Sequence, residues 1–129
     1  MRKSSRAGFT LIELLIVVVI IGILATFAVP KFQMTKGKAN AAALRSDLRN
    51  LAAAEEAYLY DYGTYTSNVS NLQTFRPTTG VTFTFGAATA GGWSARSTHP
   101  LAYPIQCGLF IGGVAPISPA TIEGLIACK

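Results

Sequence analysis

The sequence predicts an α+β fold in which one long N-terminal helix covers a small β-sheet. Three observations support this fold class. The run from Phe9 to Val29 is almost wholly apolar, residues 31–62 are rich in strong helix formers, and Val81–Phe85 alternates in the way that a strand does. With 129 residues, the chain is long enough for one small domain and not for two.

The apolar run from Phe9 to Val29 is the most distinctive element. A helix of this length measures about 31 Å at about 1.5 Å per residue, which matches the hydrocarbon core of a bilayer. It has no polar face, so we expect it to lie in lipid or in the middle of an assembly. The residues that interrupt its apolar character are Thr10, Glu13, Gly22 and Thr26.

Pro30 ends the apolar run, and helical composition resumes after it. Proline lacks an N–H and clashes with the preceding turn, so we expect a kink near Pro30. The amphipathic continuation occupies residues 30–63, with Gly63 as its C-terminal cap. Its charged residues Arg45, Asp47, Arg49 and Glu56 are expected largely on other faces than the apolar stripe. That stripe, which should cover the sheet, consists of Ala41, Leu44, Leu48, Leu51, Ala52, Leu59 and Tyr62.

Residues 64–129 are predicted to form a loop followed by the sheet. Polar and turn residues fill Thr64–Gly80, with a short helical turn near Val69–Phe75. Gly86–Gly92 is rich in small residues and is expected to turn the chain. The expected strands are Val81–Phe85, Trp93–Thr98, Ile105–Ile111 and a short last strand at Thr121–Ala127.

Charge and cysteine content narrow the class of protein. Of the net charge of +5, three positive charges precede the apolar run, and the remainder of the chain is close to balanced. No feature of this charge pattern calls for a nucleic acid partner. Cys107 and Cys128 both lie in the aqueous part, where a pair in an exported domain indicates one disulfide; the alternative is two free thiols in a cytosolic protein.

The junction at the start of the apolar run carries the most information. A basic leader ends at Gly8, and Glu13 lies about one turn into the run. An acid inside an apolar span is costly and is a functional hypothesis by default. If the chain is cut after Gly8, Phe9 gains a positive amine that can pair with Glu13 of its own chain or of a neighbour. Such a pair would fix the axial register of packed helices, because an unpaired charge in a low-dielectric core is unfavourable.

The segment Gly8-Phe9-Thr10-Leu11-Ile12-Glu13-Leu14, with the basic leader and Pro30, resembles the class III signal sequence of type IV pilins and type II secretion pseudopilins. The resemblance implies that a prepilin peptidase removes leader 1–8 by cutting after Gly8 and then N-methylates Phe9. It implies that Glu13 is the assembly residue. It also implies an antiparallel sheet of about four strands under a helix, and a C-terminal disulfide, for which Cys107 and Cys128 are the candidates.

We therefore expect a structural subunit, most simply a major pilin of a type IV pilus. The partners implied are identical subunits in a helical filament, the prepilin peptidase, and the inner membrane with its pilus assembly machinery. The precursor would have its leader in the cytoplasm and its globular domain outside; after assembly the subunit would be extracellular. No cofactor, metal ion or catalytic residue is expected, and the single histidine, His99, is expected to be structural.

Two alternatives remain open at this stage. A type II secretion pseudopilin or a minor pilin would share the same N-terminus, although residues 114–129 contain a single acid, Glu123, where an acidic calcium-binding loop is expected of major pseudopilins. A small secreted domain with an ordinary signal peptide would be cut after Ala28. That alternative must explain an apolar stretch that is longer than a usual signal core and contains Glu13.

Overall fold

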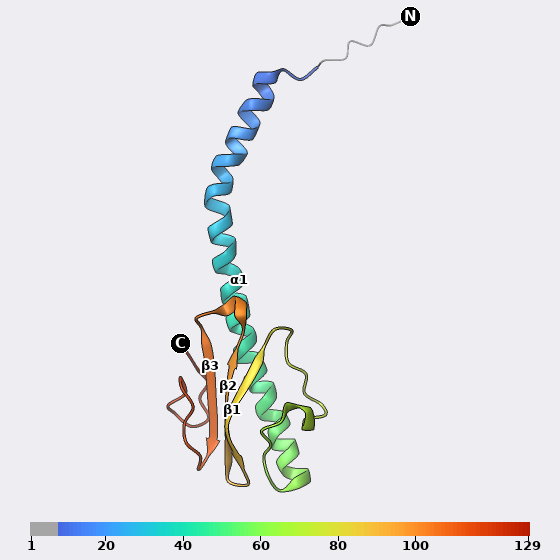
Figure 1. Ribbon diagram of the computed structural model, residues 1–129, viewed down its shortest axis with the longest axis vertical. Helices are drawn as coiled ribbons and strands as arrows, with labels where there is room; N and C mark the ends of the chain where they lie inside the picture. The colour runs from blue at the N-terminus through green and yellow to red at the C-terminus, as the bar shows by residue number, and fades with distance from the viewer. Residues whose placement is uncertain (1–7) are drawn as a thin grey trace, which may run out of the picture. The chain divides into compact units, whose positions relative to one another are not determined.

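The computed structural model describes residues 8–129 (Figure 1). The cleavable leader expected at residues 1–8 therefore lies outside the described residues, except for Gly8. The elements follow in the order α1, η1, β1, β2, η2, β3 and β4. Residues up to Thr35 and residues 36–129 form two separate compact units. The unit boundary falls inside the helix, and the boundaries at 29/30 and 63/64 expected from sequence stay predictions.

Helix α1 runs from Leu11 to Tyr62 and passes through Pro30 without interruption. Proline has no N–H for the carbonyl of Thr26, and the helix continues because one missing hydrogen bond does not outweigh the strong helix formers after it. The kink at Pro30 stays a prediction. The helix ends at Gly63, whose φ is +71° and whose N–H donates to the Leu59 carbonyl at 2.8 Å, so the predicted glycine cap is confirmed.

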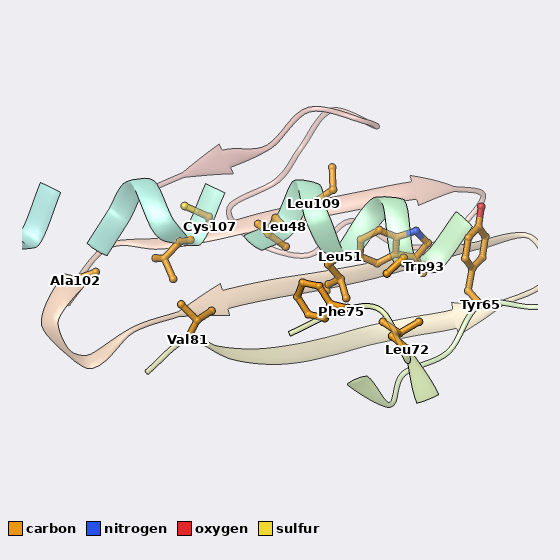
Figure 2. Packing of buried hydrophobic residues seen from close by; sticks show 13 residues of the cluster. Leu48, Leu51, Tyr65, Leu72, Phe75, Val81, Trp93, Ala102, Cys107 and Leu109 are labelled. Atoms are coloured by element: carbon orange, nitrogen blue, oxygen red, sulfur yellow. The ribbon is translucent and has the colours of Figure 1, made fainter. Parts of the chain in front are cut away.

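In the unit of residues 36–129, the second part of α1 lies against one face of the sheet (Figure 1). Leu44, Leu48 and Leu51 are fully buried, which confirms the centre of the predicted apolar stripe. Figure 2 shows Leu48 and Leu51 in the same cluster of buried side chains as Trp93, which is itself fully buried. Tyr62, in contrast, is 63% exposed, so its assignment to the covered face was wrong.

The sheet is a four-stranded antiparallel meander in the order β1-β2-β3-β4, as the fold class predicts. Trp93 and Ala95 on β2, with Cys107 and Leu109 on β3, form its covered face. The side chain of Arg96, the next residue on β2, points the other way because successive side chains in a strand alternate. The strands are β1 (Thr82–Thr89), β2 (Gly92–Thr98), β3 (Gln106–Gly112) and β4 (Ala127–Cys128).

Two sequence-based boundaries were wrong. Gly86 lies inside β1 and not in a turn, because the register shifts between Phe85 and Ala87 and pairing then continues to Thr89. The Ala87 N–H donates to Ser94 Oγ at 3.1 Å across this bulge, so its backbone donor is satisfied. The last strand is only Ala127–Cys128, since the residues before it form turns. The helical turn expected near Val69–Phe75 is confirmed as the 3-10 helix η1, Val69–Asn71.

Two buried carboxylates of α1 hold the loop that follows it. Asp47 is 3% exposed, and its two oxygens accept hydrogen bonds from the Thr78 N–H at 2.7 Å and the Thr78 hydroxyl at 2.9 Å. Glu55 is fully buried and accepts from the Thr66 N–H at 3.0 Å. The prediction that Asp47 lies on another face was therefore wrong: it is covered because a loop residue far along the chain supplies both of its donors.

A disulfide between Cys107 on β3 and Cys128 on β4 joins the two strands. These two residues are also direct partners in the antiparallel pairing of the strands. The backbone groups of Gln106 and Lys129 exchange two hydrogen bonds next to it, at 2.9 and 3.0 Å. Arg45 of α1 donates from Nε to Cys128 Sγ at 3.1 Å. Because β4 has only two residues, its place in the sheet depends heavily on this covalent link.

Replacing Cys128 with serine should destabilise residues 36–129 under oxidising conditions by about 3 kcal/mol, the loop-closure entropy for a separation of 21 residues. Urea unfolding of the detergent-solubilised chain, followed by the fluorescence of the single tryptophan, measures this difference. In reductant the variant and the parent chain should unfold at similar urea concentrations. Equal stability of the two chains without reductant would contradict a stabilising bridge.

The Glu55→Gln substitution should change how stability depends on pH. Burial raises the pKa of Glu55, with the charge of Glu56 adding to it and the Thr66 N–H opposing it. The folded state therefore favours the protonated form, and the stability of the parent chain should fall as pH rises above about 4.5 and level off above the raised pKa. The substituted glutamine cannot ionise, so this fall should disappear and stability at pH 7 should be equal or higher.

The matched comparison is Asp47→Asn, because Asp47 is a buried carboxylate of the same helix with both oxygens bonded. This variant should lose about 1–3 kcal/mol at pH 7, since one Thr78 donor is left without an acceptor. Urea unfolding between pH 4 and pH 8 measures both variants. A Glu55→Gln chain that is weaker at pH 7 and keeps the parent's pH dependence would be inconsistent with a raised Glu55 pKa.

Candidate processing and assembly site

The Gly8–Phe9 peptide bond lies just before the first helical residue, Leu11. Residues 8–10 have no regular secondary structure and are exposed, and the Phe9 side chain is 81% exposed. A side chain added at Gly8 would meet no atom within 4 Å. The bond is therefore accessible and is not part of the helical hydrogen-bond ladder, so a peptidase can bind it in an extended conformation without first unwinding α1.

Thr10 and Glu13 form a reciprocal cap at the start of α1. The Glu13 Oε2 atom accepts from the Thr10 N–H and from the Thr10 hydroxyl, each at 2.8 Å. The Glu13 N–H in turn donates to Thr10 Oγ1 at 3.3 Å. This is a capping box, in which a threonine at the N-cap and a glutamate three residues later satisfy each other's backbone donors.

The capping box determines where the Glu13 carboxylate lies. It turns back toward the helix N-terminus, where the helix dipole favours a negative charge. Its Oε2 atom contacts the amide nitrogen of Thr10, which is one residue from the nitrogen of Phe9. Among residues 8–129, its Oε1 atom has no hydrogen-bond partner and remains available to a donor. Cutting after Gly8 would therefore create an ammonium group on the residue next to the one whose amide this carboxylate already contacts.

Thr10 is the part of this site that the sequence interpretation missed. The roles of Gly8, Phe9 and Glu13 were expected from the resemblance to class III signal sequences, whereas Thr10 was treated as one of the interruptions of the apolar run. The signal was present: a Thr-x-x-Glu pattern directly before a hydrophobic run marks a helix start. The structure brings Thr10 and Glu13 together, and the roles of Gly8 and Phe9 in processing stay predictions.

The first part of α1 presents large aliphatic side chains on all sides. Within residues 9–29 no side chain is buried, and α1 is long and apolar enough to cross a membrane by length and composition. Leu14, Ile16, Val18 and Ile20, which face different directions around the helix, are each 51–59% exposed. Such a surface is unfavourable in water, so it has to be covered by lipid or by other protein.

The other residues singled out from the sequence have structural contacts. His99 is the N-cap of the 3-10 helix η2 (Pro100–Ala102): its Nδ1 atom accepts from the Leu101 N–H at 3.0 Å, and its Nε2 atom lies 3.3 Å from the Thr79 carbonyl. Nδ1 as acceptor leaves Nε2 as the protonated nitrogen. In the described part of the chain, no three His, Cys, Asp or Glu side chains are grouped as metal ligands.

Comparison with known proteins adds to this geometry. A family model described as the prokaryotic N-terminal methylation motif matches residues 3–29. The type IV wide pilus major component PilA4 of Thermus thermophilus is 35% identical over 95 residues, which are 71% of this chain and 72% of that protein. The chain belongs to the type IV pilin and pseudopilin family.

Both branches of the pilin and pseudopilin family are represented among its relatives. The type IV major pilin protein PilA of Myxococcus xanthus is 35% identical over 98 residues, or 75% of this chain and 44% of that protein. The type II secretion system core protein G of Klebsiella michiganensis is 40% identical over 73 residues, or 57% of this chain and 51% of that protein. This pilin-family chain thus spans about half the length of the secretion relatives that it matches.

Thr10→Val should weaken the start of α1 in this pilin-family chain, because valine keeps the branched shape and removes the capping hydroxyl. Loss of such a cap costs about 1 kcal/mol, which should speed exchange of the Glu13 amide hydrogen about fivefold in detergent micelles. Thr10→Ser keeps the hydroxyl and is the control, with exchange close to that of the parent chain. Unchanged protection in the valine variant would show that the cap does not hold this end.

Proposed function

We propose that this chain is a structural subunit, and not an enzyme, that assembles through its N-terminal helix into a type IV pilus. The observation that carries the proposal is the exposed apolar surface of residues 9–29, with a single carboxylate held at its start by Thr10. The match to the major pilus component of Thermus thermophilus over 71% of the chain supports the same function. The precursor would span the inner membrane, with the leader in the cytoplasm and residues 36–129 outside.

The proposed sequence of events follows from where the charges lie. A prepilin peptidase cuts the Gly8–Phe9 bond, and the new amine of Phe9 is N-methylated, which keeps its positive charge. Subunits then leave the bilayer and pack their apolar helices together. In that low-dielectric core, the amine of one subunit and Glu13 of a neighbouring subunit attract each other, and a mismatched stagger leaves both charges without a partner in the neighbour. The pair therefore selects the register while the apolar surface supplies the contact area.

The energy of helix packing does not by itself extract a subunit from the membrane. Burial of apolar surface stabilises the filament at about 25 cal/mol per Å² relative to water, but lipid already covers this surface in the precursor. The net gain on moving a helix from lipid into a filament is therefore much smaller than the buried area suggests. For this reason the proposal includes the pilus assembly machinery as a partner that supplies work.

A second candidate is a subunit of a type II secretion pseudopilus. Its support is the match to core protein G from Klebsiella michiganensis and from Pseudomonas aeruginosa, at 40% and 37% identity over 73 residues. One contact bears on the acidic calcium-binding loop expected of major pseudopilins. Glu123, the single acid of residues 114–129, already accepts a hydrogen bond from the Gly112 N–H through its Oε1 atom at 2.7 Å. A minor pilin is the remaining member of this group of functions.

The test is the intact mass and N-terminal sequence of the protein recovered from filaments sheared off the cell surface. We expect a chain that begins at N-methylated Phe9. The same N-terminus found only in envelope fractions would favour a pseudopilin or a minor pilin over the major subunit. A soluble chain that begins at Val29 would contradict both and would indicate a secreted domain with an ordinary signal peptide.

The Glu13→Ala variant tests the role of the carboxylate in the same preparation. Because Gly8 and Phe9 are unchanged, the variant should be processed normally and should accumulate in the membrane with the mature mass. Filament yield should fall strongly, since the Phe9 amine then has no carboxylate to pair with in the apolar core. Normal filaments from this variant would contradict the register argument. Glu13→Asp, which keeps the charge, should retain more filaments than the alanine variant.

A further inference from the structure

A groove runs between α1 and the flank of the sheet in the unit of residues 36–129. It has a volume of about 430 Å³. Its floor and wall are apolar, from Leu109 and Ile111 on β3 and from Leu125 and Ile126 in the C-terminal segment. Arg45 and Arg49, which lie four residues apart and so on the same face of α1, form its helical side. The groove is therefore amphipathic, with two guanidinium groups beside aliphatic side chains.

Arg49 places a positive charge at this groove, and no acidic group of the described chain neutralises it. Among residues 8–129 its side chain has no hydrogen-bond or ion-pair partner, whereas Arg45 donates to Cys128 Sγ at 3.1 Å. Leu125 at the groove wall is 54% exposed. Arginine is among the residues that are enriched at protein interfaces, and exposed aliphatic side chains beside it supply apolar surface to bury.

The C-terminal end of α1 has the complementary chemistry. Glu56 and Asp61 lie in its last two turns, and its last turn contains no basic residue. Negative charge at a helix C-terminus opposes the helix dipole, so a cation from outside would be favourable there. Glu56 accepts from the Tyr65 hydroxyl at 2.8 Å, whereas within residues 8–129 the Asp61 carboxylate has no hydrogen-bond or ion-pair partner. Beside it, Tyr60 and Tyr62 are 91% and 63% exposed, which adds apolar surface to the charge.

We propose that the groove binds the acidic, tyrosine-bearing end of α1, residues 56–62, from a second copy of this chain. This inference rests on the proposed filament function and assigns a subunit contact outside the apolar helix. The exposed tyrosines pack on the aliphatic wall, and one of the two acids, Asp61 or Glu56, pairs with Arg49. Glu56 and Asp61 are 7 and 12 residues beyond Arg49 in α1, so parallel copies would be staggered by about 10 Å if Glu56 is the partner and by about 18 Å if it is Asp61. Such a contact is heterologous and repeats from copy to copy, as a filament requires.

Charge reversal in the full-length chain, expressed in cells that lack their own copy, tests this contact. Arg49→Glu places like charges opposite each other and should reduce the yield of sheared filaments by about tenfold or more. Adding Asp61→Arg, or Glu56→Lys, to Arg49→Glu should restore much of that yield because the pair is then reversed. Arg76→Glu makes the same charge change in the loop after α1, outside the groove, and should leave the yield unchanged.

The outcomes separate this inference from the proposed function. If the unaltered chain gives no surface filaments, the proposed function fails. If it gives filaments and Arg49→Glu does so equally well, only the groove contact is overturned. Loss of filaments that neither second substitution restores also overturns it, because the groove then binds something other than this end of α1.

A second measurement tests the contact even if the Arg49→Glu chain is unstable and does not accumulate in cells. Arg49→Cys combined with Asp61→Cys in the otherwise unaltered chain should give a ladder of covalent multimers when filaments are treated with a short bis-maleimide cross-linker. Each single cysteine variant is the control and should give no ladder beyond dimers. Filaments of the double variant that remain monomeric after cross-linking would count against the contact.

Discussion

The constraint on which the rest of this structure depends is that residues 9–29 cannot remain in water. A helix that is apolar on every side has two stable environments, a bilayer and the interior of an assembly. The remainder of the molecule is compatible with either environment. A capped carboxylate marks the start of the helix without adding a polar face, and the unit of residues 36–129 has its own core and does not need the apolar segment to complete it.

Glu13 illustrates how one residue can serve two environments. In the single chain, its carboxylate is stabilised by the amide and hydroxyl of Thr10, so it is not an isolated charge. One of its oxygens has no partner among the described residues and could meet the amine that the proposed processing would create at Phe9. Under that proposal the acid is tolerable in the membrane before cutting and helps to select the register afterwards. A residue that was simply unpaired would be costly in the membrane, and one that was fully paired would carry no information about register.

Local patterns in the sequence were enough to predict the helix, its glycine cap and the centre of its apolar stripe. They also located most of three strands, because alternation and spacing depend on neighbours along the chain. Asp47 was placed on the wrong face because its burial depends on Thr78, 31 residues away, which no periodicity reveals. Gly86 was read as a turn because small residues favour turns, whereas pairing with β2 extends through it as a bulge. At the candidate site, spacing identified Glu13, and the contact with Thr10 needed the structure.

The bulge at Gly86 has a further consequence for how the sheets of neighbouring copies can meet. Strand β1 is an outer strand of the meander, and its unpaired backbone could template adventitious pairing with another sheet. The register shift between Phe85 and Ala87 interrupts that edge, and the Thr89 carbonyl is already occupied by the Tyr65 N–H at 3.2 Å. The opposite outer strand, β4, has only two residues. Both borders of the sheet are thus poor templates for amyloid-like growth, so copies of the chain packed side by side, as the proposed filament requires, would not fuse through their sheets.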